Sequence, residues 1–407
     1  MNKAGLNAIN GGPDPRFNQS LDWFLNSEHY TANVPLNFLF LNEANQLETG
    51  SIPWYKGRDV SFSRGVYQPG DKVALYYANE SVLNFANAEG KDVINFEVNI
   101  LRECIKEFNI PIKDIILIGN LYQYNNCFSI IAHSLGLSEE QLVLIDYYEM
   151  QTFFFHNVLG AKFNQQFNPT APKDLRYQFG KVNKPVRIIT MHELWEKNML
   201  DNAVTGCLID KNDIELLARE ASSEYETWFK KIVPHERIAE MLNQHHGSID
   251  NAKYFYFKRN NAVKNKIEVI NHCPGYPYDY EKIFSETKVS LVPETFYYNN
   301  QGSFLTEKIY KTIYNHHPFT LLGTPGLLSL LRSRGYKTFS NICNEMYDLC
   351  NNDRKRVSMV IDATTELIQS NNHSELNMIT KHNFSQLEKN TFSTVALLNS
   401  KISKAFN

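Results

Sequence analysis

Residues 288–339 read KVSLVPETFYYNNQGSFLTEKIYKTIYNHHPFTLLGTPGLLSLLRSRGYKTF. This stretch opens with an apolar strand that stops at Pro293-Glu294-Thr295, and it continues to a helix start at Thr306-Glu307-Lys308. Open α/β sheets bind ligands at the carboxyl ends of their strands, and the free N–H groups of a helix N-terminus attract anions. The stretch therefore predicts an α/β domain with a phosphate site at one edge of its sheet.

The residues around this helix start have distinct expected roles. Ser303 to Lys308 suit a helix entry, because Thr306 and Glu307 are typical of an N-terminal turn. Lys308 is expected to face the phosphate, and Glu294 and Glu307 are expected to be free to bind sugar or ribose hydroxyls. Spacing alone equally allows a simpler interpretation, in which Glu307 complements the helix dipole and Lys308 is solvated.

A second segment has the same pattern earlier in the chain. Residues 176–201, RYQFGKVNKPVRIITMHELWEKNMLD, combine a strand, a loop with Gly180 and a helix opening near Pro185. Lys181, Lys184 and Arg187 are the positive charges of this segment. Amides and cations at such a turn suit a diphosphate, although cations in a loop are also common on solvated surface.

The N-terminal half also has the pattern of a parallel sheet. Continuous apolar runs at Val34–Leu41, at KVALYY and at KDIILIGN are typical of strands buried on both faces. Between them, VINFEVNILRECIKEFN has helical periodicity. We therefore expect two Rossmann-like α/β domains with a cleft between them, comprising residues 1–165 and 170–407, with a helical region from about residue 354 onward.

Composition excludes several classes of protein. The 407 residues carry a net charge of −3, so no global field favours nucleic acid. The six cysteines lack C-x-x-C spacing, and no apolar stretch reaches the roughly 18 residues of a membrane span, which together favour a cytoplasmic protein. P-loop and G-x-G-x-x-G motifs are missing, and the nearest approach to a D-x-D metal motif is Asp279-Tyr280-Glu281.

Four elements within residues 288–339 carry a resemblance to a known group of enzymes. SLVPET (290–295), FLTEK (304–308), PFTLLG (318–323) and LLRSRGYKTF (330–339) occur in this order. The run is similar to the donor-binding motif of GT-B fold glycosyltransferases, notably fucosyltransferase-like families and a phage and large-virus group. Residues 176–201 resemble the entry to the C-terminal domain of that group, with lysines where the group often has arginine.

The resemblance implies a glycosyltransferase that takes a nucleotide sugar as cosubstrate and uses neither a metal nor another cofactor. It places the donor against Lys181, Lys184, Arg187, Glu294, Thr306, Glu307 and Lys308. KVALYYANES (72–81) is similar to a fucosyltransferase strand end whose glutamate is the base, so Glu80 is the first candidate. Glu43, at the end of the first strand, is the second.

The acceptor stays open at this stage. The resemblance allows transfer to a glycan, a lipid-linked acceptor or a protein, and equally to a hydroxymethylated base of DNA. Near-neutral charge counts against DNA, whereas the lysine- and aromatic-rich segment 253–266 favours it. A protein that binds nucleotide sugars or glycans without catalysis is the third alternative.

Overall fold

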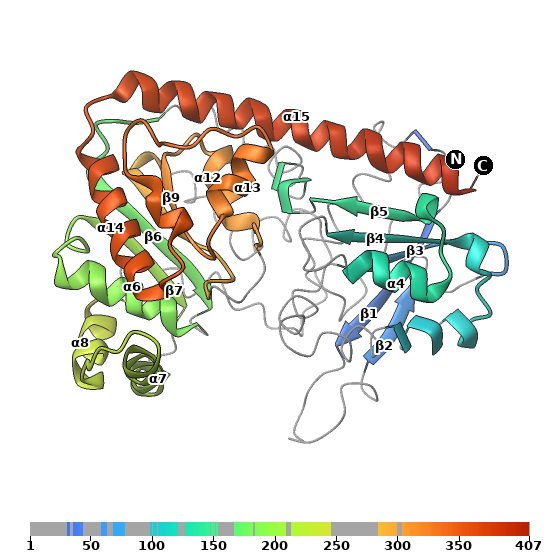
Figure 1. Cartoon of the computed structure of the whole chain (residues 1–407), viewed down its shortest axis with the longest axis horizontal. Helices are drawn as coiled ribbons and strands as arrows, with labels where there is room; N and C mark the ends of the chain where they lie inside the picture. Colours follow the sequence, from blue (N-terminus) through green and yellow to red (C-terminus); the bar gives the residue numbers. More distant parts are fainter. Residues whose placement is uncertain are drawn as a thin grey trace, which may run out of the picture. The chain divides into compact units, whose positions relative to one another are not determined.

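The structure is a computed structural model. It describes residues 31–32, 36–43, 58–62, 68–77, 98–99, 101–103, 105–120, 127–146, 148–150, 152–153, 167–181, 184–208, 213–245, 284–298 and 303–406. The chain divides into two compact units, which are unit 1, Met1–Leu159 with Lys389–Asn407, and unit 2, Gly160–Glu388. Within the described ranges, each unit has one sheet with parallel strands and helices beside it (Figure 1), so the expected α/β class is confirmed.

The sheet of unit 1 has the order β2-β1-β3-β4-β5. Its strands are β1 (Leu36–Glu43), β2 (Arg58–Phe62), β3 (Lys72–Tyr77), β4 (Ile115–Asn120) and β5 (Leu142–Ile145). All neighbours are parallel except β2, which runs antiparallel to β1. The apolar runs therefore form the expected strands, but the antiparallel edge strand β2 was not anticipated.

Local chemistry sets the ends of these strands. The segment KDIILIGN begins in a short 3-10 helix, η2 (Ile112–Asp114), and only its apolar part forms β4. Gln141, in the 3-10 helix η4 (Glu139–Gln141), donates its amide to the carbonyls of Ile112 and Ile115, both at 2.7 Å. Helix α4 (Cys127–Leu135) then packs Phe128 and Ile131 into the core below the sheet.

The sheet of unit 2 is parallel throughout, in the order β7-β6-β8-β9. Its strands are β6 (Lys173–Lys181), β7 (Ala203–Leu208), β8 (Thr287–Pro293) and β9 (Phe319–Leu322). From β6 the chain goes to β7 on one side, and it then returns to the other side of β6 to form β8 and β9. This reversal creates a topological switch point between the carboxyl ends of β6 and β8, which is where open α/β sheets bind their ligands.

The helices of unit 2 begin where the sequence provides start signals. Pro185 is the first residue of α6 (Pro185–Glu196), and Thr306 is the N-cap of α12 (Glu307–Tyr314), so both helices begin within the segments where the sequence predicted helix starts. The part of unit 2 that the structure describes also contains α7 (Ile214–Thr227), α8 (His235–His245), α13 (Leu327–Ser333), the 3-10 helix η6 (Glu345–Leu349) and α14 (Asp353–Gln369). Helix α14 packs on β9, where Thr320 and Thr364 share a hydrogen bond of 2.6 Å.

His317 lies in the core of unit 2. Helix α12 ends just before His316 and His317. The His317 ring is buried, and its nitrogens lie 2.9 Å from Ser290 Oγ and 2.8 Å from the Thr287 carbonyl. Burial lowers the pKa of His317 to about 4, so it is a neutral group that joins β8 to the start of β9.

Helix α15 (His373–Phe406) has neither proline nor glycine and runs for 34 residues. Through Glu388 it belongs to unit 2, and from Lys389 onward to unit 1, whereas the expected second domain extended to residue 407. Within unit 1, Asn399 accepts hydrogen bonds from the amides of Thr31 and Ala32, and Phe392 packs edge-on against Phe153. Among the helices of the described ranges, α15 included, none is long and apolar enough to cross a membrane.

Candidate functional site

The candidate site is built on the two loops that leave the switch point of unit 2. One loop joins β6 to the N-terminus of α6 at Pro185, and the other joins β8 to the N-terminus of α12 at Glu307. Parallel strands end at the same edge of a sheet, so both loops start at that edge. The residues predicted for the donor phosphates all belong to these two loops and helix starts.

Glu294 and Thr306 fix the start of α12 to the end of β8. The Thr306 amide donates to Glu294 Oε1 at 3.1 Å, and the Thr306 hydroxyl donates to Oε2 at 2.6 Å. The same hydroxyl accepts from the Lys308 amide at 3.4 Å, which is the N-cap contact of α12. One buried carboxyl thus holds both donors of the N-cap residue, and it sets where the helix begins.

Glu294 corrects one expectation. Its side chain is only 2% exposed, and both oxygens already accept hydrogen bonds, so it is not free to bind a hydroxyl of a ligand. Burial raises the pKa of Glu294, while Lys308 and the two Thr306 hydrogen bonds oppose that rise. Glu294 is therefore a positioning residue for the helix start, a role that the motif spacing did not distinguish from direct binding.

Lys308 lies beside this carboxyl with its ammonium partly accessible. Its Nζ is 3.0 Å from Thr306 Oγ1 and 3.3 Å from Thr295 Oγ1, and it is 3.5 Å from Glu307 Oε1. About a fifth of each of the Lys308 and Glu307 side chains is exposed. Lys308 is therefore not the fully solvated lysine of the simpler interpretation, and it is not fully buried in an ion pair either. Its ammonium group is held in place by neighbouring oxygens and stays partly accessible to solvent.

Cations from the other loop reach the same residues. Lys184, the N-cap of α6, donates through Nζ to the Thr295 carbonyl at 2.5 Å, and its ammonium lies 5.4 Å from the centre of the Phe296 ring. Arg187 Nη2 is 3.4 Å from the Glu294 carbonyl. Residues 294 and 295 therefore contact cations from α6 and α12 alike, although the two helix starts lie more than a hundred positions apart in the sequence.

Lys181 is the last residue of β6, at the carboxyl edge of the sheet, and its side chain lies outside the described part of the structure. Of the predicted donor residues, the structure brings together Lys184, Arg187, Glu294, Thr306, Glu307 and Lys308. Two ammonium groups and two helix N-termini at one sheet edge form an arrangement that suits an anion.

The predicted bases belong to unit 1. Glu43 is the last residue of β1, and β1 and β3 are adjacent parallel strands, so Glu43 lies at the carboxyl edge of that sheet. β1 connects to β2 on one side and the chain then crosses to β3 on the other, so this edge too is a switch point. The side chain of Glu43, the whole of Glu80, and residues 253–266 and 279–281 lie outside the described residues.

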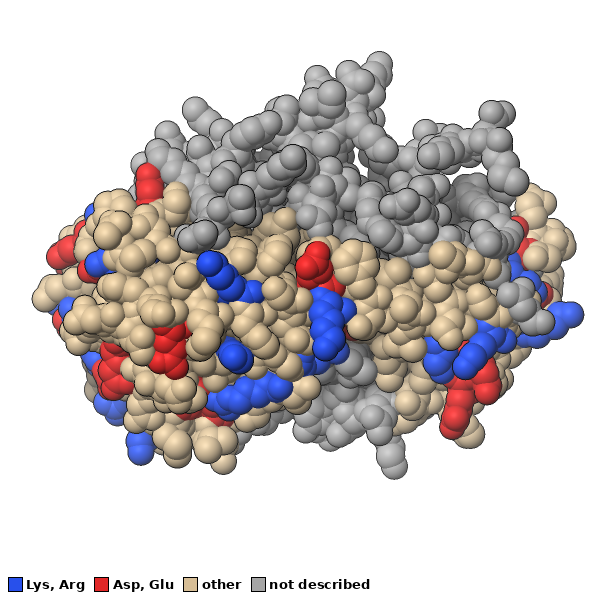
Figure 2. Space-filling model, turned by 90° about the horizontal axis from the view of Figure 1, so that it is seen from above, with Lys and Arg blue, Asp and Glu red and all other residues tan. Residues whose placement is uncertain are grey.

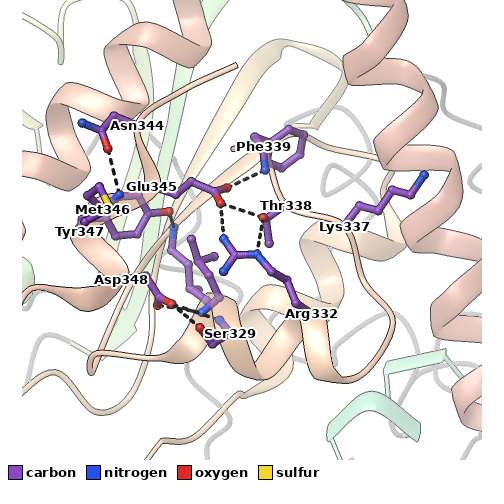
Figure 3. Close-up of polar contacts among 12 residues, drawn as sticks. Ser329, Arg332, Lys337, Thr338, Phe339, Asn344, Glu345, Met346, Tyr347 and Asp348 are labelled. Atoms are coloured by element: carbon purple, nitrogen blue, oxygen red, sulfur yellow. Dashed lines mark hydrogen bonds and ion pairs between the residues drawn. The ribbon is translucent and has the colours of Figure 1, made fainter. Parts of the chain in front are cut away.

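Sequence reasoning missed the residue that shapes the motif LLRSRGYKTF. Glu345 accepts hydrogen bonds from Thr338 Oγ1 at 2.8 Å and from the Phe339 amide at 2.6 Å, and it pairs with Arg332 (Figure 3). Asp348 similarly accepts from the amide of Leu328 at 2.8 Å, at the start of α13. The motif is thus a structural turn held by carboxylates that follow it in the sequence. The only feature of the sequence that could have indicated this role is the presence of an acidic residue shortly after the motif.

Comparison of the chain with models of protein families, with curated proteins and with solved structures finds no match. Among the described side chains, no group of three or more His, Cys, Asp or Glu residues is placed to hold a metal ion.

Proposed function

We propose that the protein is a glycosyltransferase that holds the diphosphate of a nucleotide sugar at the switch point of unit 2. The observation that carries the proposal is the meeting of Lys184 and Lys308 at Thr295, where the N-termini of α6 and α12 begin. When a glycosyl bond breaks, the departing nucleoside diphosphate gains negative charge. Fixed ammonium groups and helix amides stabilise such charge without needing to reorganise.

In this proposal each residue has a limited task. Lys184 and Lys308 bind phosphate oxygens, Glu307 orients Lys308 or accepts a ligand hydroxyl, and Glu294 with Thr306 positions the start of α12. Arg187 supports the backbone of Glu294. The proposed two-domain GT-B arrangement assigns the acceptor to unit 1, with Glu80 as the general base and Glu43 as the second candidate.

The acceptor is proposed to be a glycan, a lipid-linked sugar or a protein rather than DNA. Duplex binding depends largely on neutralising phosphates with lysine and arginine. On the face drawn in Figure 2, the described residues carry both signs of charge interspersed among uncharged ones. Such a surface gives no support to the version of the proposal in which the acceptor is DNA.

The test begins with nucleotide affinity. Titration calorimetry with UDP, GDP, ADP and CDP identifies the nucleotide, and Lys308→Met is then compared with wild type. Losing a charge-assisted contact of about 1.5 to 3 kcal/mol weakens binding by roughly 10- to 150-fold. Lys355→Met is the matched control, because Lys355 is an exposed lysine on α14 of the same unit. Equal nucleotide affinity of wild type and Lys308→Met would contradict the proposed phosphate site.

Transfer is tested separately. Incubation with the matching nucleotide sugar measures donor turnover, and a protein that binds the donor without any turnover is the non-catalytic alternative. Glu80→Gln is expected to keep donor affinity and to lose about 10²- to 10⁴-fold in transfer rate. Wild-type rates in Glu80→Gln would move the base to Glu43.

A further inference from the structure

An aromatic pair joins the C-terminus of α7 to the loop that leaves β8. Trp228 follows the last residue of α7 and is 50% exposed, although large apolar side chains are usually covered. Its ring stacks on Tyr298, with ring centres 4.9 Å apart and an angle of 30° between the planes. Tyr298 packs edge-on against the buried Tyr297. One side of the indole is thus supported by protein while half of its surface faces solvent.

Arg356 holds the loop beneath this pair. The guanidinium lies 4.5 Å from the centre of the Tyr297 ring, donates to the Tyr297 carbonyl, and pairs with Asp353 at 2.6 Å. Two positions earlier in the same loop, Lys184 binds the carbonyl of Thr295. The part of the loop that leads to Tyr298 is therefore held in place by neighbouring side chains before any ligand arrives.

Glu224 adds a carboxylate to the same surface. It lies one helical turn before Trp228 on α7, and the Glu224 carbonyl accepts from the Trp228 amide at 2.9 Å. Within the described ranges its half-buried carboxyl has no hydrogen-bond or ion-pair partner. Burial, with the nearby charge of Asp353, raises the pKa of Glu224 to about 7. A partly desolvated carboxyl without a donor favours a ligand that supplies one.

We propose that Trp228, Tyr298 and Glu224 form the subsite for the nucleoside of the donor, with the base stacked on Trp228 and Glu224 accepting hydrogen bonds from the base or the ribose. This inference rests on the proposed function, because it assigns the remaining part of the nucleotide whose phosphates are placed at Lys184 and Lys308. Thr295 and Tyr298 are three positions apart in the chain, so their Cα atoms are at most about 11 Å apart. The phosphate contacts at Thr295 and the ring of Tyr298 that supports Trp228 thus lie on one short loop, as the phosphate and base share one nucleotide.

The chemistry of the surface favours a nucleoside over other occupants. Every base offers a flat π-face, and stacking on an aromatic side chain contributes enough for 5- to 150-fold in affinity per base. The carboxyl beside the ring matches the N–H and O–H donors of a nucleoside. A carboxylate or phosphate group placed against the ring would be repelled by Glu224 and Asp353, and a lipid chain would leave the carboxyl without a donor.

The test compares ligands with and without a base. Affinity for the nucleoside diphosphate that binds wild type, chosen from UDP, GDP, ADP and CDP, is measured for Trp228→Ala and Trp228→Phe, alongside inorganic pyrophosphate. We expect Trp228→Ala to weaken the nucleotide by about 5- to 150-fold, Trp228→Phe to restore most of it, and pyrophosphate to bind all three proteins alike. Ile232→Ala is the control, because Ile232 is 86% exposed just beyond α7.

Three results would overturn the inference, and they separate it from the proposed function. Unchanged nucleotide affinity in Trp228→Ala removes the base subsite and leaves the phosphate site standing. A parallel loss of pyrophosphate binding shows that Trp228 only supports the fold around the lysines. If wild type binds none of the four nucleotides, both the subsite and the proposed function are lost.

Discussion

Replacing Thr306 by valine tests whether one hydroxyl joins β8 to α12. Valine keeps the shape of the side chain but loses the 2.6 Å hydrogen bond to Glu294 and the N-cap contact to the Lys308 amide. Losing an N-cap costs about 1 kcal/mol, and losing a hydrogen bond to a buried carboxylate costs about 1.5 to 3 kcal/mol. Because the two contributions share one hydroxyl, we expect Thr306→Val to lower the free energy of unfolding by about 2 to 4 kcal/mol.

Thermal and urea denaturation measure this change. For a unit of this size, about 2 to 4 kcal/mol lowers the midpoint by roughly 4 to 16 °C. Thr306→Ser keeps the hydroxyl and should recover most of the loss. Thr312→Val is the matched control, because Thr312 is equally buried but only donates to the helical carbonyl of Lys308, at 3.0 Å. If Thr306→Val and Thr312→Val lose the same small amount, the Glu294 contact does not hold the helix.

Three further predictions concern charged and titrating groups. His317 has a pKa near 4 in the folded state, below its usual value of about 6.5, so the neutral ring stabilises the fold above pH 6.5. As the pH falls from 6.5 to 4, we expect the free energy of unfolding to drop by about 3 kcal/mol. Urea denaturation across that range should show a smaller drop for His317→Gln than for wild type. Glu224, with a pKa near 7, has the opposite sign, because its folded state favours the protonated form and loses stability as the pH rises from 4.5 through 7. After allowing for solvent screening, the free energy of unfolding of Glu224→Gln should be about 1 to 2 kcal/mol higher than that of wild type at pH 8 and equal to it near pH 4. Equal stability of the two proteins at pH 8 would contradict this. Glu345→Gln turns one carboxylate oxygen, which accepts from Arg332 or the Phe339 amide, into an NH2 group that cannot accept. Chemical denaturation should therefore show a fall of about 1 to 3 kcal/mol in the free energy of unfolding. A change below about 0.5 kcal/mol would show that the turn does not need the carboxylate.

Local signals predicted the start of each helix at the candidate site. Thr306 and Pro185 act through their own backbone neighbours, so the sequence alone located both helix starts. The role of Glu294 was not predictable in this way. Whether its carboxyl binds a ligand or Thr306 depends on the distance between two segments twelve residues apart, and spacing in the sequence does not contain that distance.

Other features depend on tertiary contacts from the outset. The apolar runs predicted β1, β3 and β4, but the short edge strand β2, RDVSF, has too little periodicity to be recognised. The pairing of Trp228 with Tyr298 joins a helix end to a distant loop, and no pattern within either segment indicates it. The predicted roles of Glu80 and Glu43 stay predictions.

The last nineteen residues of the chain have a consequence for how unit 1 can be obtained. They supply Asn390, which donates to Glu149 at 2.7 Å, and they bury Val395 and Leu398. A fragment that ends at residue 159 lacks these side chains, and one that begins at residue 160 carries their apolar face without its partner. During synthesis, the contacts that Asn390, Phe392 and Asn399 make within unit 1 therefore form only after the residues of unit 2 have been made.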